Sequence, residues 1–267
     1  DRPTARPHVL LDADHFTIPG EVRSGLRVPM ALFYTIYAHG IQDRFPVDPN
    51  APRQRVVFFF GNMDPKAYVR NEVQAVFGCF NRMHLLKLVR SEFADQVYEP
   101  HKLVAVDARG ERHIVLVDRA HAHIDTRNLL PILSRYDFFL APSGVVMPLC
   151  HNLVEALCAG CIPILQHPHL MEPPLRHGVD CLSFTTEQEL VELLRNVPMM
   201  DAGTVLQMRR NALAYYQRYL TPEAVVGEME KQGAKLQRLR LNGEYVSVEL
   251  LRKKLLANGI EGPLPRS

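Results

Sequence analysis

From Arg55 onward, short apolar runs alternate with segments of helical pattern, and this alternation constrains the fold more than any other feature of the sequence. Most of these runs are followed by turns rich in glycine, proline or small polar residues. The runs are Val56–Phe60, Tyr136–Ala141, Cys161–Leu165 and Leu182–Phe184. Strands that alternate with helices are typical of parallel sheets. The pattern therefore predicts an α/β fold, with a Rossmann-like parallel sheet and flanking helices.

Capping signals and composition place the helices. Asp64 followed by Pro65 supplies an N-cap and a first helical proline, and Thr186 and Glu189 have the spacing of a capping box. We also expect helices at 129–135, which contains Pro131, at about 148–159, and largely from Ala202 onward, at 215–219, 222–241 and 248–257.

The segments Lys102–Val106 and His113–Val117 flank the turn-rich Asp107–Gly110, which predicts a hairpin or an irregular pair of strands. Upstream, the polar cluster Asp48–Pro52 has the composition of a linker. We therefore divide the chain into a short N-terminal segment (1–53), a Rossmann-like domain (54–220) and C-terminal helices forming a helical tail (221–267).

Charge and cysteine content exclude several classes of protein. Thirty-one basic and 29 acidic residues leave a formal charge of +2, which argues against nucleic acid or a membrane as the main partner. No apolar run approaches the roughly 18 to 20 residues of a membrane span. Five cysteines, an odd number in mostly apolar surroundings, favour a reducing compartment, so we expect a cytoplasmic protein. Because the chain begins with Asp1, we also expect it to belong to a longer chain or a larger assembly.

Two loops are expected at the carboxyl ends of the strands, where open parallel sheets bind their ligands. They are Gly61–Pro65 and Pro142–Pro148. The second loop carries Ser143 and Gly144 and leads into a helix whose N-terminus favours an anion such as a pyrophosphate. His151 and Glu155 are four residues apart, so they share one face of that helix. A carboxylate there can accept hydrogen bonds from both hydroxyls of a ribose.

The same stretch carries a resemblance to a known family. The run YDFFLAPSG (136–144), followed by HNLVEALCAGCIPIL (151–165), resembles the donor-site signature of GT-B-type glycosyltransferases. The exostosin-like and fucosyltransferase-like branches share the pattern of a glutamate, Ala-Leu, two residues, Gly, one residue and Ile/Val-Pro. The segment 55–70 is similar to the start of their donor domain, and the resemblance covers roughly residues 55 to 200.

The resemblance implies a fold and a set of site residues. It implies a GT-B-type donor domain in which Glu155 binds the ribose and Arg70, within the helix after the first strand, meets the phosphates. The donor-binding residues expected on this basis and from the two loops are Gly61, Asn62, Arg70, Ser143, Gly144, His151, Asn152 and Glu155. The partners would be a nucleotide-sugar, as substrate rather than cofactor, and a glycan acceptor. Residues 1–53 would then be a reduced acceptor-side segment.

Several of these residues also have simpler interpretations. Glu155 could be a solvated helix residue and Arg70 an ordinary surface arginine. His151 could contact the ligand or cap its own helix. Cys158 and Cys161 have the spacing of a redox or zinc pair, but no second cysteine pair exists, so we interpret both as packing residues. The group His113, His121, His123 and Asp125 has irregular spacing, which favours a solvated surface over a metal site.

Asp12-Ala13-Asp14 supports a different hypothesis. GT-A glycosyltransferases hold a divalent cation with an Asp-x-Asp motif at the end of a strand, and carboxylates suit such a cation. Only eleven residues precede the motif here, too few for a nucleotide-binding half, so we expect no metal. We instead treat Asp12, Asp14 and His15 as candidate acceptor-side or catalytic residues. Three hypotheses remain: a metal-independent GT-B transferase, a non-catalytic sugar-nucleotide or glycan-binding module, and a metal-dependent GT-A-like transferase.

Overall fold

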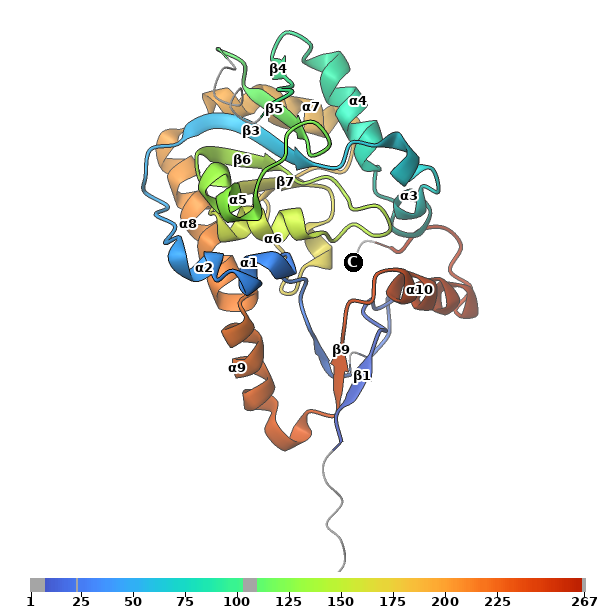
Figure 1. Cartoon of the computed structure of the whole chain (residues 1–267). Helices are drawn as coiled ribbons and strands as arrows, with labels where there is room; N and C mark the ends of the chain where they lie inside the picture. The colour runs from blue at the N-terminus through green and yellow to red at the C-terminus, as the bar shows by residue number, and fades with distance from the viewer. Residues whose placement is uncertain (1–7, 23, 103–109, 266–267) are drawn as a thin grey trace, which may run out of the picture.

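A six-stranded parallel sheet forms the centre of the structure, a computed structural model that describes residues 8–22, 24–102 and 110–265. The strands lie in the order β4-β5-β3-β6-β7-β8. Figure 1 shows this order from β4 to β7. Their bounds are β3 Gln54–Gly61, β4 Val97–Tyr98, β5 Ile114–Asp118, β6 Tyr136–Leu140, β7 Ile162–Leu165 and β8 Leu182–Ser183. Every pair of neighbours in this sheet is parallel. The predicted α/β class, a Rossmann-like parallel sheet with flanking helices, is confirmed.

Helices cover both faces of this sheet (Figure 1). In one group, α5 and α8 each pack against α6; in another, α4 packs against α7. The helices of the domain are α3 Glu72–Phe77, α4 Arg82–Glu92, α5 Thr126–Leu133, α6 His151–Cys158, α7 Glu187–Asn196 and α8 Ala202–Tyr219. All five residues of β6 are buried, and the Phe58 and Tyr136 rings stack across the sheet at 4.7 Å between centroids. Burial on both faces explains why these strands are continuous apolar runs in the sequence.

A second, smaller sheet joins the two ends of the described chain. Its order is β1-β9-β2, with β1 at Leu10–Asp12, β2 at Leu26–Arg27 and β9 at Arg238–Arg240, all parallel. The predicted N-terminal segment and the predicted C-terminal segment therefore share one sheet (Figure 1). Helix α10 (Tyr245–Ala257) is tied to it because the Ser247 hydroxyl donates to the Ala13 carbonyl at 2.7 Å.

The local capping signals predicted from the sequence are confirmed. The Asp64 carboxylate accepts a hydrogen bond from the Lys66 backbone N–H at 2.9 Å, and the Thr186 hydroxyl accepts one from Glu189 N–H at 3.2 Å. The Glu189 carboxylate returns to the backbone N–H of Thr185 rather than Thr186. Pro131 lies inside α5, as expected.

Three expected elements differ in the structure. The helix after Asp64 is a short 3₁₀ segment, η1 (Pro65–Tyr68), because Asn71 takes a left-handed conformation with φ of 47° before α3 begins. Helix α6 begins at His151, three residues later than expected at 148. The helix predicted over 222–241 is α9, Pro222–Gln232; Gly233 has φ of 49°, and the chain then forms β9.

Other segments also differ from expectation, and α4 and β4 had no predicted counterpart. Two short helices, α1 (Tyr34–Ala38) and α2 (Ile41–Arg44), fold in the N-terminal segment, where the sequence predicted none. Most of the predicted strand 102–106 lies outside the described residues, and its expected hairpin partner is β5, which pairs in parallel with β3 and β4. Within the described ranges, no helix combines the length and apolar content needed to cross a bilayer.

Candidate functional site

The candidate site lies where β3 and β6 end side by side. Phe58 pairs with Phe139 in parallel register, so both strands end at the same edge of the sheet. After β3 the chain builds β4 and β5 on one side, and it then crosses to β6 on the other side. Such a reversal of strand order leaves a crevice at the carboxyl ends of the strands, which is the usual ligand site of open α/β sheets. The two predicted loops leave the sheet at this point.

Gly61 occupies a narrow space at the end of β3. A Cβ atom at this residue would lie 2.9 Å from the Phe59 ring, 3.1 Å from an Arg82 guanidinium nitrogen and 3.2 Å from the Asn152 amide nitrogen. The Asn152 amide also donates to the Phe60 carbonyl at 2.7 Å, which holds the start of α6 against β3. The predicted site residues Gly61 and Asn152 are therefore in contact, and they meet a third residue that was not predicted.

That third residue, Arg82, is a buried cation at the first position of α4. Its side chain is only 5% exposed, and one guanidinium nitrogen donates to the Asn62 carbonyl at 3.2 Å. The guanidinium carbon lies 5.5 Å from the centre of the Phe59 ring and 5.6 Å from that of Tyr68, distances typical of cation–π contacts. The Arg82 Nε is buried without a hydrogen-bond partner among the described residues. Arg82 is a charged donor with capacity left to bind an anion.

Sequence reasoning missed Arg82 although a signal was present. A positive charge in the first turn of a helix opposes the helix dipole, so an arginine directly after the N-cap Asn81 calls for a compensating anion. The predicted phosphate residue, Arg70, is exposed and lies in the turn after η1. The expectation that Arg70 lies within a helix is therefore wrong, because the 3₁₀ segment ends before it. Its contact with phosphate stays a prediction.

The loop between β6 and α6 is tightly folded. Ser143 is only 1% exposed, and a Cβ at Gly144 would lie 2.8 Å from the backbone oxygen of Met147. The N-cap of α6 is Cys150, which makes no side-chain capping hydrogen bond, and no acidic residue lies in the first turn. A helix start without a side-chain cap or a carboxylate has backbone N–H groups and a positive dipole end available for an anion.

We expect Gly144→Ala to lower kcat/KM for donor turnover by roughly ten- to a hundredfold, since a shift of about 1 Å at a positioning loop has effects of this size. The reason is that the new Cβ would lie 2.8 Å from the backbone oxygen of Met147, and a backbone atom cannot yield without a movement of the loop. The matched control is Gly227→Ala in α9, where a Cβ meets no atom within 4 Å. Equal activity of the two variants in steady-state assays would show that this loop does not position the donor.

His151, the first residue of α6, contacts the N-terminal segment. Its Nδ1 donates to the Ala31 carbonyl at 2.9 Å, and its ring packs edge-on against Phe33 with 5.4 Å between centroids. Of the two predicted roles, capping its own helix is not seen. In a neutral ring this bond leaves Nε2 as an acceptor, which suits a ligand hydroxyl. Binding of the ligand by His151 stays a prediction.

Glu155 is a buried carboxyl group on the same face of α6. It is only 7% exposed, so its alternative interpretation as a solvated helix residue is wrong. Burial raises the pKa of the Glu155 carboxyl to about 7. Among the described residues no side chain or backbone group forms a hydrogen bond or ion pair with it. Buried carboxyls without partners are rare because they are costly, and this one fits a ligand that brings hydroxyl donors.

The candidate catalytic residues lie at the end of β1 and directly after it. Asp12 faces Arg238 at 3.5 Å, and Asp14 lies 2.7 Å from Lys254. His15 is 1% exposed, and burial, followed by the charge of Arg27, lowers its pKa to about 3. The positive charges of Arg238 and Lys254 thus compensate the Asp12 and Asp14 carboxylates, and this disfavours binding of a divalent cation between the two carboxylates. Within the described part of the chain, no group of three or more potential ligands has a geometry suited to a metal.

The surroundings of the cysteine pair and of the histidine group do not favour a functional site. Cys158 and Cys161 are free and buried, and burial raises the pKa of each thiol to about 12. A thiol with such a pKa stays protonated at neutral pH and is a poor nucleophile. In the histidine group, His121 lies 3.5 Å from Asp118, and Asp125 caps α5 while pairing with Arg127.

We expect Cys158→Ala to leave donor turnover and bound metal unchanged, because the thiol is protonated and outside the crevice. Metal analysis of the purified protein, alongside steady-state kinetics, checks this. Stoichiometric zinc that disappears in the variant would contradict it.

Comparisons with known proteins find similarity in fold only. No protein-family model matches the chain, and no curated protein is significantly similar to it. Among solved structures, it is similar to HepE from Anabaena in complex with UDP, with 13% identity and a TM-score of 0.43 over 76% of this chain and 52% of HepE. It is similar to an alpha-glucosyltransferase in complex with UDP-glucose and DNA containing an abasic site, with 11% identity and a TM-score of 0.47 over 80% of this chain and 59% of that one.

A third similar structure is a single domain. It is the C-terminal domain of the glycosyl transferase group 1 family protein LpcC from Francisella tularensis, with 13% identity and a TM-score of 0.39 over 68% of this chain and 92% of that one. The chain thus spans about half to three fifths of the first two proteins.

Proposed function

We propose that this chain is a GT-B-type glycosyltransferase that binds a nucleotide-sugar at the β3–β6 edge and transfers the sugar to a glycan or other acceptor. The observation that carries the proposal is the buried Glu155 carboxyl, which has no partner among the described residues and follows an uncapped helix start by one turn. A ribose has two adjacent hydroxyls that can donate to one carboxylate. A diphosphate attached to it would then reach the N-terminus of α6.

Each of the remaining residues has a role in this proposal. The α6 N-terminus and the Ser143-Gly144 loop bind the diphosphate from one side, and Arg82 binds it from the β3 side. Asn62 and Arg70 complete the β3 side if the turn after η1 closes over the ligand.

The arrangement also suggests how transfer would be assisted. Negative charge gathers on the diphosphate as the bond to the sugar breaks, and fixed N–H donors and a guanidinium stabilise it more in the transition state than in the ground state. No metal is required for this. If configuration is inverted, a general base is needed, and Asp12, Asp14 and His15 are the candidates on the acceptor side. At its lowered pKa, His15 is neutral and is a weak base.

Finer assignments follow from the sequence motif. The pattern around Glu155 favours the exostosin-like and fucosyltransferase-like branches, with polysaccharide biosynthesis as the setting. The free, buried cysteines fit a reducing compartment, and we propose the cytoplasm.

Donor hydrolysis and transfer assays with and without EDTA separate the three hypotheses. We expect activity that resists chelation. Loss of activity with EDTA would support the GT-A-like use of Asp12 and Asp14, and tight nucleotide binding without turnover would support a non-catalytic module. A panel of UDP-, GDP-, ADP- and CDP-sugars identifies the base in the same experiment.

A further inference from the structure

Two neighbouring aromatic side chains are exposed beside the start of α6. Phe33 is 39% exposed and Tyr34 is 69% exposed, and their ring centroids lie 4.8 Å apart. The Phe33 ring also packs edge-on against the ring of His151, the first residue of α6. Among the described Phe and Tyr side chains, one other is exposed, Tyr245 on α10. Most of the exposed aromatic surface of the described chain therefore lies next to the proposed diphosphate site.

The local fold of α1 does not explain why aromatic residues stand at its start. Phe33 occupies the N-cap position of α1 and makes no side-chain capping hydrogen bond. Ser, Thr, Asn and Asp are preferred at this position because their side chains accept from free backbone N–H groups, so a phenylalanine gives up local stability. Positions at which a sequence breaks such a local rule are commonly functional.

The segment that carries the two rings is fixed from both sides. Ile36, in the same short helix, is fully buried, and the Thr35 hydroxyl donates to the Thr126 hydroxyl at 3.3 Å, which ties α1 to α5. The bond from His151 Nδ1 to the Ala31 carbonyl ties the preceding residues to α6. A surface that is ordered before a ligand arrives loses little conformational entropy on binding, which favours affinity.

The chemistry of this surface indicates the kind of ligand. Flat aromatic faces can pack against the C–H groups of a sugar ring, and the Tyr34 hydroxyl and His151 Nε2 can form hydrogen bonds with its hydroxyl groups. Residues 28–38 include no Asp, Glu, Lys or Arg, so the surroundings favour a neutral ligand. A nucleic acid strand stacked on such rings would also need a basic groove for its phosphates.

We infer that Phe33 and Tyr34 form an aromatic platform on which a sugar residue of the acceptor glycan stacks. The inference rests on the proposed function, which places the leaving diphosphate at the N-terminus of α6. In that proposal the donor is held by β3, α4, the β6–α6 loop and α6, whereas Phe33 and Tyr34 belong to the segment before the central sheet. A sugar on the platform therefore approaches the donor from outside the elements that bind it.

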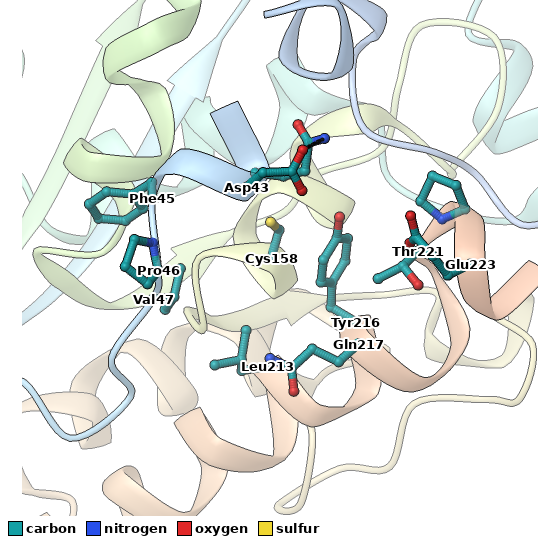
Figure 2. A pocket seen from close by; sticks show the side chains of 12 residues that line it. Asp43, Phe45, Pro46, Val47, Cys158, Leu213, Tyr216, Gln217, Thr221 and Glu223 are labelled. Atoms are coloured by element: carbon teal, nitrogen blue, oxygen red, sulfur yellow. Dashed lines mark hydrogen bonds between the residues drawn. The ribbon is translucent and has the colours of Figure 1, made fainter. Parts of the chain in front are cut away.

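The cavity at the other end of α6 does not compete for this role. Figure 2 shows the Cys158 thiol and the Tyr216 hydroxyl facing each other there. Both side chains are buried, so each is the other's neighbour inside the protein. Neither polar group calls for a ligand.

Binding of disaccharides to the full chain tests the inference. Cellobiose, maltose, lactose and N,N′-diacetylchitobiose are added at millimolar concentration to protein saturated with the nucleoside diphosphate of its donor, and binding is measured by saturation-transfer NMR. We expect at least one disaccharide to bind. Tyr34→Ala should weaken that binding by about tenfold and raise the acceptor KM equally, since one aromatic contact contributes on this order.

Matched variants separate an aromatic platform from general surface effects. Tyr34→Phe should bind nearly as well as wild type because the ring is kept, and Tyr34→Leu should resemble Tyr34→Ala because it has no flat face. The control is Tyr245→Ala. Tyr245 is 51% exposed and, like Tyr34, is the first residue of a helix, so the two alanine variants make similar changes to the fold. Tyr245→Ala should leave disaccharide binding unchanged.

The outcomes separate this inference from the proposed function. If the nucleoside diphosphate binds in calorimetry but no disaccharide does, or if Tyr34→Ala and Tyr245→Ala bind the disaccharide equally, the platform is wrong and the proposed function stands. A rise in the donor KM alone in Tyr34→Ala, or binding of a short oligothymidine in place of the disaccharides, would also overturn the inference. If no nucleoside diphosphate binds, the proposed function fails, and the inference fails with it.

Discussion

Replacing Arg82 by alanine is expected to lower kcat for sugar transfer by roughly a hundred- to a thousandfold, the usual loss when one charge-stabilising donor is removed from a site. Arg82 is buried beside Gly61 and Asn152, and its Nε has no hydrogen-bond partner among the described residues. An arginine in that position can form a fork to two phosphate oxygens, and the low exposure strengthens the interaction. The loss should appear in kcat as well as in kcat/KM, since the charge develops on the leaving group.

Three variants separate this role from a structural one. Arg82→Lys should recover only part of the activity because a point charge replaces a bidentate fork. Arg82→Met keeps much of the packing against Phe59 and Tyr68 but removes the charge, so it should resemble Arg82→Ala in turnover and wild type in circular dichroism. Arg70→Ala measures how much the exposed turn after η1 contributes to kcat for sugar transfer. Full activity of a folded Arg82→Met variant would exclude Arg82 from the phosphate site.

Replacing Glu155 by glutamine is expected to make the free protein more stable at pH 8, by on the order of 3 kcal/mol at most. Burial raises the pKa of this carboxyl from 4.5 to about 7, so the folded chain holds its proton more tightly than the unfolded chain. The stability that the group contributes is therefore fully present below about pH 4.5, and it is lost as the pH rises to about 7. Above that pH the folded chain carries an uncompensated buried charge.

Urea unfolding at several pH values checks this expectation. The wild type should lose stability between about pH 4.5 and 7 relative to Glu155→Gln, and the two curves should then run parallel. The control is Glu230→Gln, an exposed carboxyl on α9, whose curve should follow the wild type. A wild-type curve parallel to that of Glu155→Gln across this range would mean that the Glu155 carboxyl is solvated or paired.

The inner strands of the central sheet were predictable because they are buried on both faces, whereas the half-buried edge strand β4 was not predicted. Tyr136–Leu140 and Ile162–Leu165 are continuous apolar runs bounded by turn residues, and such runs have few alternatives to a parallel strand. The small sheet was not predictable in this way. Arg238–Arg240 is short, polar and preceded by a helix, and it becomes a strand only by pairing with Leu10–Asp12 and Leu26–Arg27, more than 200 residues earlier. Pairing at that distance leaves no local signal.

The candidate site was predictable where local pattern and topology agree. The position of the loop before α6, and the position of Glu155 on α6, could be predicted because a strand, a turn and a helix follow one another directly in the sequence. The burial of Glu155 was missed because it depends on packing against α6 from other parts of the chain. Arg82 was missed for a similar reason: α4 brings it back to the end of β3 after an intervening 3₁₀ segment and α3.

Calorimetric titration of the protein with a nucleoside diphosphate at pH 6, in buffers of different ionisation enthalpy, tests the ribose contact most directly. If ribose hydroxyls donate to the Glu155 carboxylate, binding stabilises the ionised form and releases a proton that the free protein holds at this pH. We predict that wild type releases nearly one proton more than Glu155→Gln, and that this difference vanishes at pH 8. Glu155→Gln should also bind about ten- to a hundredfold more weakly. Equal affinity and equal proton release in the two proteins would contradict the account.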